Sequence, residues 1–315
     1  MNTTSADVRD EVAPSRPPSV AIRLASGGLP ARAEAPFRED LAWSIAASIL
    51  YALSQAASIV VLVKFTSAAD VGQWGLGFAI ATPAFLLANL YLRTVQASDA
   101  SGEFDLADHL GLRLVTTCVA TVALVAGTVA WSGSLHAAAV ILIVVLIKAV
   151  DAVCDILCGH FFQRAAVKAA AVTMLVNAVT SWVALSVAVI ASGSVVLGAA
   201  GSLVGSCVAL AYAARVVAAN YGAAALVPRF GLETMRRLAT RAAPLGLAGM
   251  RSSLHASVPR VAVAYALGEA AVGLFTALSA AAALGGFLTV PVAQAALPRL
   301  ARARAAGDSR AFRLL

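Results

Sequence analysis

The sequence has little charge for its length: 12% of its 315 residues are Asp, Glu, Lys or Arg, and 60% are hydrophobic. A soluble domain carries roughly twice that charged fraction. With a mean hydropathy of +0.86, the chain cannot be a single core enclosed by a polar surface. The composition indicates a polytopic membrane protein.

Cysteine is also scarce, and its placement gives no disulfide framework. Cys154 and Cys158 are one helical turn apart, but no nearby His or further Cys completes a metal site. We interpret them as small core residues and expect no metal or cofactor. The glycines at 72, 75 and 77 follow no strand, so they do not form a nucleotide-binding loop. All four cysteines fall in apolar runs: Cys118, Cys154, Cys158 and Cys207.

Residues 1–40 mix Pro, Ser, Ala and both charge signs, without the apolar run of a signal peptide, and are predicted to be a disordered cytoplasmic tail. Eight apolar runs follow, each near the length of about 20 residues that a spanning helix needs. They lack the period-two alternation of a membrane β-barrel. The predicted spans are Ala42–Val63, Trp74–Leu92, Leu112–Trp131, Ala137–Gly159, Val167–Ala191, Val195–Val217, Ala242–Leu267 and Ala271–Leu297.

The basic residues fix the expected orientation. With a cytoplasmic N-terminus, 19 Lys and Arg residues fall in inside segments, and Lys64 alone falls in an outside connection. This asymmetry matches the positive-inside rule. The net charge of +7 is therefore assigned to topology and the anionic inner leaflet, and not to nucleic acid. The outside connections are too short for an extracytoplasmic catalytic domain.

Two stretches resemble each other at an offset of 201: Val71-Gly72-Gln73-Trp74 and Val272-Gly273-Leu274-Phe275. Six predicted spans separate them, so both copies have the same orientation, as in a parallel two-bundle transporter. We therefore predict a first six-helix bundle over residues 41–240. Residues 241–315 are predicted to be the first hairpin of a second bundle, and about four further helices are expected downstream.

The pattern around Ser54-Gln55 and over Phe65–Arg93 resembles the first hairpin of polysaccharide and lipid-linked oligosaccharide flippases of the multidrug/oligosaccharidyl-lipid/polysaccharide exporter superfamily. Gly273–Ala280 and Gln294–Asp308 resemble the corresponding hairpin of the second half. The resemblance implies two bundles around a central cavity, alternating access, and export of an undecaprenyl-pyrophosphate-linked glycan across the bacterial inner membrane.

Lys148, Asp151 and Asp155 share one face of the fourth span, with Lys148 near mid-membrane. Intramembrane charges usually face a cavity or a partner. Lys148 and Asp151 either neutralise each other and lock helices together, or serve the substrate phosphate and a coupling cation or proton. Asp155, near the cytoplasmic end, is expected to be solvated, with ion coupling as the alternative role.

Other polar residues give weaker signals. Arg251 on the seventh span is expected to be a cavity cation, and His255, one turn later, a helix contact or a proton relay. Arg93 is interpreted as a snorkelling anchor, or as a first contact for lipid phosphate. Gln55 and Asn89 are candidates for interhelical hydrogen bonds or for sugar contacts.

The leading hypothesis is a non-enzymatic transporter of a lipid-linked anionic glycan, working in the bilayer with a polymerase or glycosyltransferases as possible partners. A drug exporter of the same architecture is the first alternative. Midspan cations (Lys148, Arg251, Arg260) outnumber the carboxylates Asp151 and Asp155, which favours an anionic substrate. An inactive fragment or a non-transporting assembly partner is the other alternative.

Overall fold

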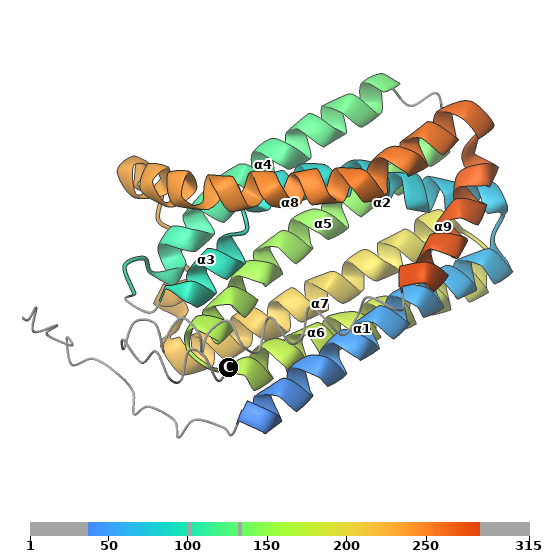
Figure 1. The fold of residues 1–315 in the computed structure, drawn as a ribbon. Helices are drawn as coiled ribbons and strands as arrows, with labels where there is room; N and C mark the ends of the chain where they lie inside the picture. The colour runs from blue at the N-terminus through green and yellow to red at the C-terminus, as the bar shows by residue number, and fades with distance from the viewer. Residues whose placement is uncertain (1–36, 100–101, 132–133, 284–315) are drawn as a thin grey trace, which may run out of the picture. The chain divides into compact units, whose positions relative to one another are not determined.

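The computed structural model describes residues 37–99, 102–131 and 134–283, and this part of the chain is helical without β-strands. Its elements are α1 (Phe37–Phe65), α2 (Ala68–Asn89), α3 (Leu92–Ser98), α4 (Leu106–Trp131), α5 (Leu135–Gln163), α6 (Val167–Ser192), α7 (Val195–Tyr221), the 3₁₀ turn η1 (Ala223–Leu226), α8 (Leu232–Leu267) and α9 (Glu269–Ala283) (Figure 1). The predicted all-α class is confirmed. The predicted disordered tail covers residues 1–40. Residues 1–36 lie outside the described residues, and α1 begins at Phe37, within the last part of the predicted tail. Residues 284–297 of the eighth predicted span also lie outside, and so does Gln294.

Six segments of this fold are long and apolar enough to cross a membrane: 39–65, 68–98, 106–130, 135–163, 167–192 and 195–221. Many large apolar side chains on them face outward; Val60, Val119 and Val129 are 64%, 65% and 67% exposed. A surface this apolar requires lipid rather than water around it. The chain is a multi-pass membrane protein. The seventh predicted span lies within α8, which begins ten residues before Ala242 and is more polar than the other six.

Serine residues stand at the N-terminal ends of three of the helices. Ser67, Ser134 and Ser194 each accept a hydrogen bond from a backbone N–H in the first turn of α2, α5 and α7. At α2 the cap is reciprocal, since Asp70 accepts from the Ser67 backbone N–H at 3.2 Å. These caps satisfy N–H groups that would otherwise be unpaired at helix ends, and they fix the turns that the sequence predicts.

Helix α5 is central to the first bundle (α1–α7), because it packs against α2, α3, α4, α6 and α7. Helices α6 and α7 pack closely through glycine. A side chain at Gly201 or Gly205 would overlap the backbone of Ala184 or Ser181 on α6. Thr180 Oγ1 also donates to the Gly205 carbonyl oxygen at 3.0 Å. Glycines four residues apart, at 201 and 205, thus allow α6 and α7 to pack closely.

The second predicted span is interrupted. Leu90 and Tyr91 adopt left-handed backbone conformations (φ 49° and 53°), so α2 ends and the short helix α3 begins. Left-handed φ values are unfavourable for side chains such as these. Helix α8 packs against the break through two glycines, because a side chain at Gly246 or Gly249 would collide with Leu90 or Tyr91.

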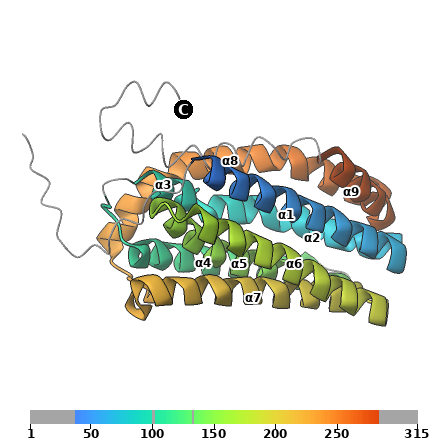
Figure 2. The ribbon, with the colours of Figure 1, turned by 90° about the horizontal axis from the view of Figure 1, so that it is seen from below.

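The two stretches of the internal repeat lie against each other. The α8–α9 hairpin packs along α2, with α9 at the end of α2 away from α3 (Figure 1 and Figure 2). A side chain at Gly72 would meet the carbonyl of Glu269, and one at Gly273 would meet the carbonyl of Ala68. Because 269 is 68 plus 201 and 273 is 72 plus 201, the contacts are reciprocal.

A third contact of this α2–α9 seam lies on the symmetry axis. A side chain at Gly75 would meet Thr276, its own counterpart at the offset of 201. Reciprocal contacts with a self-paired position at the centre are the pattern of a twofold rotation. The seam therefore supports the repeat that the sequence suggests. A side-chain hydrogen bond also crosses the seam, away from the symmetry axis: Gln73 Nε2 donates to Glu269 Oε2 at 2.9 Å.

Candidate functional site

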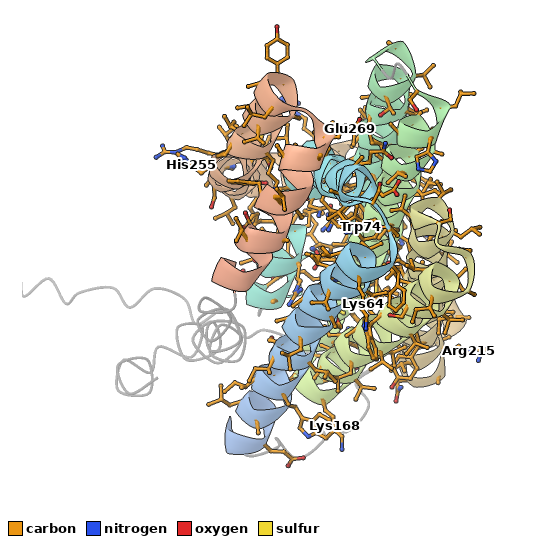
Figure 3. All side chains as sticks on the ribbon, turned by 90° about the vertical axis from the view of Figure 1, so that its right-hand side faces the viewer. Lys64, Trp74, Lys168, Arg215, His255 and Glu269 are labelled. Carbon is orange, nitrogen blue, oxygen red and sulfur yellow. The ribbon has the colours of Figure 1, made fainter. Side chains whose placement is uncertain are left out.

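A small polar pocket lies within the first bundle, lined by α1, α2, α5, α6 and α7. Helix α5 contributes Lys148 and Asp151, and α1 contributes Gln55. The aromatic side chains Trp74 and Phe78 close it on the α2 side; Trp74 is 5% exposed and points among the helices (Figure 3). The other lining residues are Tyr51, Ser54, Ser58, Ile147, Asn177, Ala178, Ser181, Trp182, Ser202 and Ser206.

Lys148 and Asp151 have different partners in this pocket. The Lys148 ammonium lies 4.8 Å from the centroid of the Phe78 ring, a cation–π distance. No ion pair within 4.0 Å includes Lys148 in the described part of the chain. Asp151 Oδ1 instead accepts a hydrogen bond from Asn177 Nδ2 at 3.2 Å. The two charges thus share a pocket without forming a direct bridge.

A hydrogen-bond chain continues from Asp151 across the neighbouring helices. Asn177 Oδ1 accepts from Ser181 Oγ at 2.8 Å, and Ser181 Oγ lies 3.3 Å from the Ser202 carbonyl oxygen on α7. Amide and hydroxyl groups of this kind hold a buried carboxylate in place. This series of hydrogen bonds therefore fixes the position of Asp151. It does not include Lys148.

The pocket is small. Its cavity volume is about 20 Å³, and a water molecule needs ~10–15 Å³ measured in the same way. The space therefore accommodates one water or one small ion, and it is far too small for a sugar diphosphate in this conformation.

A second charged cluster joins α3, α4 and α5. Asp155 Oδ1 pairs with Arg93 Nη1 at 3.0 Å, and Asp155 Oδ2 pairs with Arg113 Nη2 at 3.3 Å. The expectation that Asp155 is simply solvated is wrong, because it bridges two arginines. Arg93 is likewise more than a snorkelling anchor. Arg113 is not among the candidates from the sequence, yet its side chain is 0% exposed and takes part in this cluster.

The remaining candidates lie elsewhere. Arg251 and His255 are exposed on α8, and Figure 3 shows His255 on the outer side of that helix. Helix α8 packs against α2, α3, α4 and α9, so Arg251 does not line the Lys148 pocket. Asn89 is half-buried near the end of α2, and its Oδ1 has no hydrogen-bond partner among the described residues. The structure thus brings Lys148, Asp151 and Gln55 together, and separately Arg93 and Asp155.

Comparison with protein families identifies one family whose model, described as polysaccharide biosynthesis protein, matches residues 37–304. No curated protein matches the chain by sequence.

Solved structures share the fold at low identity. One described as "protein A" has a TM-score of 0.67 at 12% identity, covering 86% of this chain and 65% of its own. A MOP superfamily transporter from Pyrococcus furiosus has a TM-score of 0.61 at 16% identity, covering 89% and 68%. An outward-facing multidrug resistance MATE transporter of the same superfamily has a TM-score of 0.64 at 15% identity, also covering 89% and 68%. The present chain thus spans about two thirds of the length of each.

Proposed function

The chain belongs to the polysaccharide biosynthesis protein family, and from this membership we propose that it carries a lipid-linked anionic glycan across the bacterial inner membrane. It would work as a carrier and not as an enzyme, with its N-terminus in the cytoplasm. The observation that carries the proposal is Lys148, a cation inside a membrane-embedded bundle that no carboxylate of the described residues bridges.

The substrate class follows from the physical problem of its headgroup. A sugar diphosphate cannot cross hydrocarbon unless the protein replaces its water with cations and hydrogen-bond donors, while the lipid tail stays in the bilayer. A charge inside a membrane is expensive, so an ammonium left without a salt bridge is best explained by an anion that visits it. Arg93 and Arg251 are the further cations proposed to meet the substrate, at other points of its path.

The small volume of the Lys148 pocket requires movement. The α2–α9 seam, closed by Gly72, Gly75 and Gly273, would have to separate for an alternating-access cycle. Glycine contacts bury little side-chain area, so such a seam can part with a small loss of packing. The Gln73–Glu269 hydrogen bond would break with it.

Asp151 would supply the coupling. Held by Asn177 and close to a space for one small ion, it would bind a proton or cation in one conformation and release it in the other. His255, exposed on α8, and Asp155, bridged by arginines, are weaker candidates for this role.

The test is export of surface glycan in cells that depend on this gene for it, at matched protein levels in the membrane. Lys148→Met should abolish glycan export, and Lys148→Arg should retain a part of it, because the charge is kept. Lys168→Met is the matched control: Lys168 is exposed and its ammonium also lies over an aromatic ring, 4.9 Å from Trp43, outside the pocket. Normal export by Lys148→Met would contradict the proposal.

Drug export is the second candidate, because one neighbour of the same fold is a multidrug resistance MATE transporter and another is described as MATE. A cationic drug would depend on Asp151 and would be repelled by Lys148. Drug accumulation in cells expressing Asp151→Asn and Lys148→Met therefore separates the two functions. Under the drug reading, Lys148→Met preserves or improves efflux.

A further inference from the structure

The cluster of Arg93, Arg113 and Asp155, here called the arginine triad, has more positive charge than its carboxylate can neutralise. Two guanidinium groups share one Asp155, each through a single N–H···O contact, at 3.0 Å and 3.3 Å. An arginine can donate five hydrogen bonds in a planar fork. A net positive charge inside a membrane protein calls for a further anion or for water.

The unused donors of the triad are buried. Arg93 Nη2, Arg113 Nε and Arg113 Nη1 have no hydrogen-bond partner among the described residues. The same holds for both amide atoms of Gln96, whose side chain is also completely buried. Leaving a buried donor unsatisfied costs about 1–3 kcal/mol, and more when the group is charged. Several such donors at one place therefore point to a missing acceptor.

Local structure places these donors together. The break at Leu90 and Tyr91 redirects the chain so that α3 carries Arg93 and Gln96 toward α5. Gly159 lets them approach, because a side chain there would meet Gln96 and lie 3.2 Å from the Arg93 Cα. Arg113 closes the back of the cluster with no exposed area, whereas Arg93 and Asp155 are 22% and 28% exposed. The cluster thus has a closed rear and an accessible edge.

We propose that the arginine triad is a binding site for a phosphate group, and that Asp155 occupies it when no ligand is bound. A tetrahedral phosphate group presents its oxygens in several directions, which match the paired forks of Arg93 and Arg113 better than one planar carboxylate does. The site is separate from the Lys148 pocket, since Lys148 and Asp155 are seven positions apart on α5, about 10 Å along the helix axis.

The phosphate could come from a membrane lipid headgroup or from a soluble phosphate compound, since both present the same chemistry. The binding itself does not depend on glycan transport. If the triad binds no phosphate, the proposed role of Lys148 still stands. The export assay on Lys148, in turn, does not test phosphate binding by the triad.

The test measures binding to the full chain in nanodiscs of phosphatidylcholine. One arm titrates inorganic pyrophosphate by calorimetry; the other adds phosphatidylglycerol to the nanodiscs and counts retained lipid by native mass spectrometry. We expect saturable binding in at least one arm. Arg93→Gln and Arg113→Gln should weaken it about tenfold or more, the loss of a charge-assisted hydrogen bond. Asp155→Asn should strengthen it by a similar factor, because the competing carboxylate is gone.

The exposed Arg229–Asp105 pair, with N···O of 2.8 Å, provides the matched controls. Arg229→Gln and Asp105→Asn should leave the affinity unchanged. If Arg113→Gln does not fold, the affinities of Arg93→Gln and Asp155→Asn for phosphate test the proposal. Absence of saturable binding in both arms would overturn the proposal, and so would an Asp155→Asn protein that binds no more tightly than wild type, because a purely structural bridge predicts both results.

Discussion

At the scale of single residues, the charges on α5 are used in two different ways. Lys148 and Asp151 face a small pocket, where an aromatic ring and an amide are their neighbours. Asp155, one turn further, turns toward α3 and α4 and holds two arginines. Sequence spacing predicts that the three share a face, but a rotation of about 40° between residues four apart is enough to direct Asp151 and Asp155 to different partners.

Two glycines differ in the space around them, and this difference gives a prediction for the stability of the bundle. Gly205→Ala should lower the stability of the bundle by about 1–3 kcal/mol, as overpacking does, because the added methyl would overlap the Ser181 backbone. Gly127→Ala is the matched control: Gly127 lies on α4 with nothing within 4 Å of an added Cβ, so better helix propensity should make it neutral or slightly stabilising.

Thermal unfolding of the two purified variants in one detergent measures the difference. A Gly205→Ala protein as stable as Gly127→Ala would mean that α6 and α7 are not in close contact there.

At the scale of elements, the sequence predicts the helices well and their interruptions poorly. Apolar runs and short polar turns identify the six membrane-crossing segments, because both features are local. The break between α2 and α3 is not local. Leu90 and Tyr91 carry no turn signal, and what accommodates the break is Gly246 and Gly249 of α8, about 155 residues later.

The α2–α9 seam is the contact that would have to open in the proposed alternating-access cycle, and a disulfide across it tests this. Gly75→Cys with Thr276→Cys, in a protein lacking the exposed Cys118 and Cys207, should form a bond, because a Cβ at Gly75 would lie 3.1 Å from the Thr276 Cβ and disulfides need roughly 3.5–4.5 Å. We expect oxidation to stop transport and a reductant to restore it.

Gly127→Cys with Thr276→Cys serves as the control pair, since Gly127 has open space around it. Full transport activity in the oxidised Gly75–Thr276 pair would show that the seam stays closed throughout the cycle.

At the scale of the whole molecule, the sequence predicts what is summed over many residues and misses what depends on a few contacts. The all-α class and the six membrane-crossing segments follow from composition and apolar runs, whereas the sequence predicts eight spans. The arginine triad does not follow from them, because it depends on how α3 and α4 pack against α5. The placement of Arg251 away from Lys148 likewise depends on how α8 packs.

Orientation in the membrane is the last whole-molecule prediction. The start of α8 carries Arg236, Arg237 and Arg241, and the last two pair with Glu103 between α3 and α4, at 2.7 Å and 2.9 Å. The basic start of α8 thus lies at the end of the bundle that holds α3. From the positive-inside rule we predict that this end faces the cytoplasm.

Cysteines introduced one at a time into the protein lacking the exposed Cys118 and Cys207 test this orientation, one in the α6–α7 turn and one at the opposite end of α7; Cys154 and Cys158 remain buried. Ser192→Cys should react with a membrane-impermeant maleimide in intact cells, because its turn is predicted to face outward. Ala223→Cys, exposed in η1, should react only after the membrane is permeabilised. The reverse pattern would place the arginine triad on the outer face, where it would meet a phosphate after transport and not before it.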